Sequence, residues 1–114
     1  MKRETGDYIE DIINAMEKAM SFIEGMSYGE FIEDDKGIFA VIRALEIIGE
    51  AAKKIPDEMR KNYPEIPWKG MTGMRDKMSH EYFGVNLKLV WETVKERIPE
   101  AKPLFDKMFR DLEK

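Results

Sequence analysis

The sequence lacks cysteine and has no long run of apolar residues. Without cysteine, the chain cannot form a disulfide framework, a thiolate zinc site or a cysteine nucleophile. Uncharged stretches reach only six residues, as from Tyr82 to Leu87, whereas a membrane-spanning helix needs roughly 20. No apolar segment follows the charged residues at the N-terminus, as it would in a secretory signal. We therefore expect a soluble, cytoplasmic protein without a membrane segment.

The chain is acidic overall, and basic side chains outnumber acidic ones only in its middle. Of the 114 residues, 37% are charged and 43% hydrophobic, which predicts a single globular domain over residues 1–114. The net charge of -4 argues against coating nucleic acid through bulk electrostatics. Residues 53–77 nevertheless carry seven basic and four acidic side chains. Lys69 and Lys77 in this stretch could steer RNA, contact an acidic partner or simply form a solvated helix face.

Apolar residues recur at helical spacing through nearly the whole chain, and no strand pattern competes with them. Capping pairs begin two of the helices, Asp7 with Glu10 and Ser27 with Glu30. The expected long helices cover 7–24, 36–55, 68–83, 86–98 and 100–113. A short connector helix should follow Ser27 and end near residues 33–35, and a helical turn or two could form within 57–62. These segments predict an all-α, antiparallel up-and-down bundle with four to five main helices plus short connector helices.

Glycine and proline mark the expected helix ends. Gly25 should stop the first helix, Pro56 the helix 36–55, and Pro99 the helix capped by Asn86. In the short connector helix, Phe31 and Ile32 form the expected apolar face. The helix 36–55 should be the most buried, through a stripe of Phe39, Ile42, Leu45, Ile48, Ala52 and Ile55.

The chain has a single histidine, His80, in the most informative segment of the sequence. At about 100° per residue, an apolar stripe of methionines runs beside a broad polar arc on this helix. The stripe consists of Met71, Met74 and Met78, and the arc of Arg75, Asp76, Ser79, His80 and Tyr82. The polar arc is therefore a candidate site.

These residue types suit the cleavage of a phosphodiester without a metal. Asp76 lies four residues before His80 and could orient its imidazole, which could then exchange a proton with a ribose hydroxyl or a leaving oxygen. Arg75 offers a permanent charge and several donors to a phosphate. One histidine cannot easily act as both acid and base, so the hypothesis works better if two copies of the helix meet in a dimer. A solvent-exposed histidine without a catalytic role is the alternative.

The spacing Arg75, four residues, His80, one residue, Tyr82 resembles the motif of the HEPN superfamily, specifically the HepT-like group of ribonuclease toxins. The resemblance extends over essentially the whole chain. It includes the runs Ala44–Ala52, Pro64–Trp68, Gly73–Arg75 and His80–Phe83. It implies a homodimeric helical bundle, with the two motif helices facing each other across a cleft, that cleaves RNA without a metal or other cofactor.

The resemblance also assigns roles to individual residues. Arg75 would contact the scissile phosphate, and His80 would be the acid–base residue. Tyr82 matches a tyrosine that the family's partner, a minimal nucleotidyltransferase antitoxin, modifies with AMP. The added bulk and negative charge would silence the toxin. Asp76 stands where the family usually has a small polar residue, often asparagine, so its charge could alter the affinity for RNA.

Two functions follow as hypotheses. The first is a ribonuclease toxin that uses Arg75 and His80 and is silenced through Tyr82. The second is a non-catalytic docking or substrate-binding subunit for a nucleotidyltransferase. Glu46 and Glu50 stand four apart, but the sequence contains no Glu-x-x-His pair, so we reject a di-metal centre. We expect Glu50 instead to form a buried hydrogen bond or ion pair.

Overall fold

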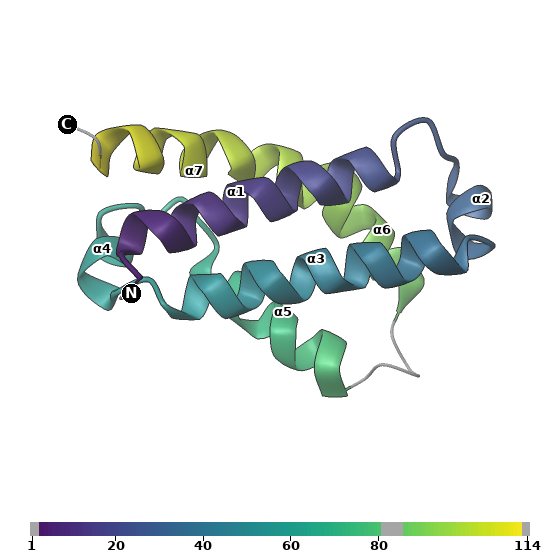
Figure 1. Ribbon diagram of the computed structural model, residues 1–114, viewed down its shortest axis with the longest axis horizontal. Helices are drawn as coiled ribbons and strands as arrows, with labels where there is room; N and C mark the ends of the chain where they lie inside the picture. Colours follow the sequence, from purple (N-terminus) through teal and green to yellow (C-terminus); the bar gives the residue numbers. More distant parts are fainter. Residues whose placement is uncertain (1–2, 81–85, 113–114) are drawn as a thin grey trace.

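Two long antiparallel helices, α1 (Thr5–Phe22) and α3 (Asp35–Lys53), form the centre of the computed structural model (Figure 1). The structure describes residues 3–80 and 86–112, and the side chains of 3–74 and 86–112. The further elements are α2 (Tyr28–Ile32), α4 (Asp57–Lys61), α5 (Trp68–His80), α6 (Leu87–Glu92), the π-helical turn η2 (Thr93–Arg97) and α7 (Ile98–Leu112). The predicted all-α fold is confirmed for these residues.

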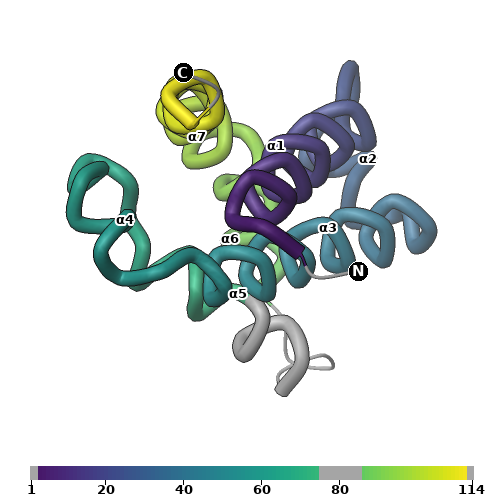
Figure 2. Tube along the Cα trace, turned by 60° about the vertical axis from the view of Figure 1, so that its left-hand side comes forward, coloured from purple at the N-terminus to yellow at the C-terminus, as the bar shows by residue number. Residues whose placement is uncertain are grey.

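The outer helices extend the central pair on opposite sides. α5 packs against α3, and α7 packs against α1. Figure 2 shows the resulting order, with α7 beyond α1, α5 beyond α3, and α4 lying to one side. Successive long helices run in opposite directions along the bundle, as an up-and-down arrangement requires (Figure 1). α5 and α7 are therefore the two ends of the row.

The core lies between α1 and α3 and continues under α7. The buried residues of α1 recur at intervals of three or four, which is the period of one helix face. Those with no exposed surface in α1 are Ile9, Ile12, Met16 and Ala19. Leu45 and Ile48 of α3 and Phe105 and Met108 of α7 meet them in the same cluster. No described helix is long and apolar enough to cross a membrane.

Local capping explains most helix starts. Ser27 caps α2, since its Oγ accepts a hydrogen bond from the Glu30 N–H at 3.1 Å and Glu30 accepts one from the Ser27 N–H at 2.9 Å. Asn86 caps α6 by accepting from the Leu89 N–H at 3.1 Å. Both predicted caps are confirmed. Gly25 follows α1 with φ of 79°, a conformation that favours glycine.

The predicted start of the first helix was late by two residues. Asp7 is not the N-cap residue but the N3 member of a capping box with Glu4; its carboxylate accepts a hydrogen bond from the N–H of Glu4 at 2.9 Å. A carboxylate in the first turn satisfies a free backbone donor and interacts favourably with the helix dipole. Asp7 therefore stabilises this start from inside the helix.

Phe39 was wrongly predicted to belong to the buried stripe of α3. Its side chain is 57% exposed, whereas Ile48 is fully buried. Each step of three residues falls short of a full helical turn by about 60°. The nine residues from Phe39 to Ile48 therefore rotate the side-chain direction by about 180° around the helix axis. Phe39 therefore lies on the opposite side of the helix from Ile48. In α2, Phe31 is buried as predicted, but Ile32 is 39% exposed.

Pro99 does not end a helix, contrary to the prediction. α6, η2 and α7 follow one another without a gap, and Pro99 and Pro103 both lie within α7. Proline lacks an N–H, and its ring collides with the carbonyl four residues earlier in an α-helix. In η2 the N–H of Ile98 donates to Thr93, five residues back. This wider turn changes the register of the acceptor carbonyls just before Pro99, which lets the helix continue.

The crossover from α3 to α5 is tied to the end of α3 and to α7. Arg60 donates to the carbonyl of Ile55 at 2.9 Å and to that of Ala52 at 3.0 Å, which caps the end of α3. Trp68 packs edge-on against Phe105 of α7, with ring centroids 5.5 Å apart. The hydroxyl of Tyr63 donates a 2.7 Å hydrogen bond to Asp111. The crossover thereby connects α3 with the C-terminal helix.

The hydrogen bond between Tyr63 and Asp111 should make stability depend on pH. This bond, together with burial, raises the pKa of Tyr63 above its usual value of 10.0. A raised pKa means that the stabilisation is complete below about pH 10 and is lost as the pH rises through the folded-state value. We expect Tyr63→Phe to lower the free energy of unfolding at pH 7 by about 1 kcal/mol.

Urea denaturation of both proteins, at pH 7 and at successive values above about pH 10, measures this effect. The difference between them should shrink as the tyrosine hydroxyl ionises. A difference that stays constant over the whole range would show that the hydroxyl proton is not the source of the stabilisation.

Candidate functional site

Helix α5 carries the backbone of the predicted site as far as His80. It begins at Trp68 as predicted, and positions 75, 76, 79 and 80 lie in its last two turns. The side chains of Arg75, Asp76, Lys77, Ser79 and His80, and the whole of Tyr82, lie outside the described residues. The same holds for the predicted end of this helix near Phe83. Lys69 is described, and it is exposed in the first turn of α5.

Two methionines set the orientation of α5 against the bundle. Met71 is 3% exposed, and Met74 is half-buried and packs against the core, as predicted for these two members of the apolar stripe. The side chain of Met78, the third member, lies outside the described residues. Position 80 lies nine residues after Met71, which corresponds to a rotation of about 180° around the helix. The backbone at position 80 is therefore on the side of α5 opposite Met71.

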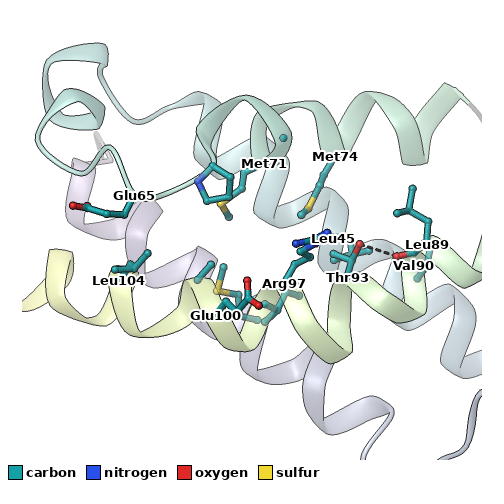
Figure 3. Close-up of a pocket in the computed structure, with 15 residues that line it drawn as sticks. Leu45, Glu65, Met71, Met74, Leu89, Val90, Thr93, Arg97, Glu100 and Leu104 are labelled. Carbon is teal, nitrogen blue, oxygen red and sulfur yellow. Dashed lines mark hydrogen bonds between the residues drawn. The ribbon is translucent and has the colours of Figure 1, made fainter.

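A pocket of about 490 Å³ lies between α5 and α7, and Met16 of α1 and Leu45 of α3 also line it. Figure 3 shows it between α5 above and the helices α6, η2 and α7 below. Its lining is mostly aliphatic and thioether. The lining residues are Met16, Leu45, Glu65, Pro67, Gly70, Met71, Met74, Leu89, Val90, Thr93, Arg97, Ile98, Glu100, Ala101 and Leu104.

Three charged side chains, Glu65, Arg97 and Glu100, line this pocket. In Figure 3, Arg97 extends from the lower helix toward α5, between Glu100 and Thr93. Thr93 is engaged separately, because its hydroxyl donates to the Leu89 carbonyl at 2.7 Å. Within residues 3–74 and 86–112, none of the three charged side chains has a hydrogen bond or ion pair.

Sequence reasoning did not single out this pocket or Arg97. The predicted break at Pro99 assigned Arg97 and Glu100 to two different helices, so their common face could not be recognised. The signal was present in the period itself, because Val90, Val94 and Ile98 continue to Ala101 and Phe105 at helical spacing across the proline.

Glu50 of the acidic pair on α3 has an ion pair that the structure describes. Glu50 forms an ion pair with Arg43 at 3.4 Å, but its side chain is 40% exposed, so this pair is not buried as predicted. Because the pair is partly exposed, water screens its charges and the pair contributes little to stability. A buried pair would need further hydrogen bonds to offset the cost of desolvating both charges. Among the described side chains, no group of three or more His, Cys, Asp or Glu could hold a metal ion.

Comparison with known proteins identifies the family. The model of the HepT-like ribonuclease family matches residues 12–108. A probable ribonuclease HepT of Thermococcus cleftensis is 51% identical over 108 residues, covering 95% of this chain and 98% of that protein. Two candidate RNases of Methanocaldococcus jannaschii are 49% and 47% identical over 112 residues, which is 98% of this chain and 97% and 93% of theirs. No solved structure matches the chain significantly. Because the family model and the relatives cover nearly the whole sequence, this chain belongs to the HepT-like ribonucleases.

Proposed function

We propose that this chain is a metal-independent endoribonuclease and the toxin of a cytoplasmic toxin–antitoxin pair. The observation that carries the proposal is the placement of Arg75 and His80 within the single helix α5, in a chain of the HepT-like ribonuclease family. A continuous helix keeps these two positions at a constant separation. Catalysis requires the group that binds the phosphate and the group that transfers the proton to be held in such a fixed geometry.

The proposed reaction uses the ribose next to the scissile bond. His80 removes the proton of the 2′-hydroxyl, and O2′ attacks phosphorus. The bond from phosphorus to O5′ breaks, and O5′ takes up a proton from a general acid. The products are a 2′,3′-cyclic phosphate and a 5′-hydroxyl end. Arg75 stabilises the negative charge that builds up on the phosphate oxygens.

A homodimer would provide both the acid and the base. The chain has one histidine, so the second proton-transfer group would come from His80 of a second copy. Position 80 lies on the side of α5 opposite the buried Met71, and this supports an encounter between two such helices away from the core. Asp76 and Ser79 would then support the same cleft, and Lys69 and Lys77 would steer RNA toward it.

Regulation would act through Tyr82. A minimal nucleotidyltransferase partner would transfer AMP to its hydroxyl, as the resemblance to the HepT-like group implies. The added phosphate carries negative charge to the end of the motif, where it would repel the RNA backbone. Tyr82 is therefore the proposed off-switch of the ribonuclease.

A cleavage assay in EDTA tests this function. Purified unmodified protein should cut single-stranded RNA and leave cyclic phosphate ends, but it should not cut the same strand carrying 2′-deoxyribose throughout. The reason is that the attacking oxygen is missing. Incubation with the nucleotidyltransferase and ATP should add AMP to Tyr82, seen by mass spectrometry, and abolish cleavage. Cleavage of the deoxy strand, or activity only with added metal, would contradict the mechanism.

The second candidate is a docking subunit for a nucleotidyltransferase. The net charge of -4 and the acidic Asp76 favour it, since both weaken the attraction of RNA phosphates. In that case a stable complex with the transferase would form equally well with His80→Ala, and neither protein would cleave RNA.

A further inference from the structure

We infer that the pocket between α5 and α7 binds one unpaired nucleotide of the RNA, its base between the methionine and leucine side chains and its phosphate at Arg97. This inference rests on the proposed ribonuclease function, because it assigns a part of that enzyme's substrate to the pocket. The pocket belongs to a single chain and needs no second copy.

The size and lining of the pocket suit a nucleobase. Its volume of about 490 Å³ lies within the range of small-ligand sites, roughly 300–1,000 Å³. Met71 and Met74 form one wall, and Leu104 lies on the opposite helix (Figure 3). Flat bases taken out of a stack are held between aromatic or apolar side chains. Thioethers are also polarisable and adapt their shape to aromatic rings.

The charges of the pocket favour an anion at one end. Arg97 extends into it and has no ion pair or hydrogen bond with any side chain that the structure describes. Its planar guanidinium can hold two phosphate oxygens at once. Glu65 lies toward the other end, near the start of α5, and Glu100 lies beside Arg97 on the side that faces this end (Figure 3). They would repel a phosphate there and could accept hydrogen bonds from a ribose hydroxyl or a base amino group.

The proposed catalytic positions follow the pocket along α5, but position 80 lies on the other side of this helix from Met71. Met74 lines it, and Arg75 is the next residue of the same helix. From Met74 to position 80, the helix rises by about 9 Å. An RNA strand with one base in the pocket would therefore have to pass around α5 to reach the cleaved bond. A base must leave its stack and its pair to enter, so the pocket favours single-stranded RNA.

Nuclear magnetic resonance of ¹³C-methyl methionine can test the pocket without any cleavage. Met16, Met71 and Met74 line it, whereas Met20, Met59 and Met108 do not. The probes are the four nucleoside 5′-monophosphates, with inorganic phosphate for comparison. We expect saturable shifts of the first three methyl signals with at least one nucleotide, and weaker or no shifts with phosphate alone.

Two pairs of variants make the test specific. Arg97→Gln should weaken nucleotide binding by about tenfold or more, as expected for the loss of a charge-assisted hydrogen bond. Arg110→Gln, an exposed position of α7 outside the pocket, should leave it unchanged. Gly70 lines the pocket, and a Cβ added there meets no atom within 4 Å. Gly70→Leu should therefore fold and fill the pocket, whereas Gly70→Ala is the matched control with similar helix propensity.

The outcomes separate this inference from the proposed function. The inference is overturned if no nucleotide shifts the three methyl signals, if phosphate alone shifts them equally, or if both Arg97→Gln and Gly70→Leu bind like the unaltered protein. If the shifts behave as expected but RNA is not cleaved, the pocket stands as a nucleotide site and the ribonuclease proposal fails. If RNA is cleaved without these shifts, the ribonuclease stands and the pocket inference fails.

Discussion

Replacing His80 by alanine is expected to lower the rate of RNA cleavage by a factor of about 10² to 10⁴, the usual contribution of a positioned general acid or base. His80 is the only histidine of the chain, so no neighbouring imidazole can substitute for it. The measurement is the initial rate of cleavage of one labelled RNA by both proteins. Helicity and the mass of the assembly serve as controls for folding and dimerisation.

A mixed dimer sharpens this experiment. If one histidine acts as the base and the partner's His80 as the acid, a dimer of one unaltered and one His80→Ala subunit should lose most of its activity. If each subunit works independently, the mixed dimer should keep about half the rate of the unaltered dimer. Cleavage by the homodimeric His80→Ala protein at the unaltered rate would remove His80 from the mechanism.

Replacing Phe105 by alanine is expected to lower the free energy of unfolding by about 3–5 kcal/mol. Phe105 has no exposed surface, and its ring forms a T-shaped pair with Trp68, with ring centroids 5.5 Å apart. The substitution would leave a cavity between α7 and the start of α5. A domain of this size has a total stability of roughly 5–15 kcal/mol, so the loss approaches the whole of it at the lower end.

Leu112→Ala on the same helix is the matched control, because Leu112 is 41% exposed. Its truncation should cost about 1 kcal/mol or less, since little apolar area returns to water. Chemical denaturation of the three proteins under identical conditions gives both values. Equal losses for the two variants would mean that α7 is not anchored through Phe105.

Local features of the structure were predictable because neighbouring residues determine them. Ser27 and Asn86 cap helices through backbone groups only three residues away, so the sequence pattern contains the whole interaction. The burial of Met71 and Met74 on α5 likewise follows from the helical period. The error at Phe39 arose within the same kind of reasoning, since a spacing of three drifts around the helix and only the position of the neighbouring helices shows which side is buried.

The sequence by itself determined the helical composition, the absence of disulfides, most helix ends and the spacing of Arg75 and His80. These depend on short-range geometry and on the chemistry of single residues. Only the tertiary structure decided that the helix passes through Pro99, that Tyr63 reaches Asp111 from 48 residues away, and that Arg97 extends into a pocket beside α5. Such features depend on how separate helices pack, which no local pattern encodes, because contacts between distant segments are selected by the shape and burial of the whole core.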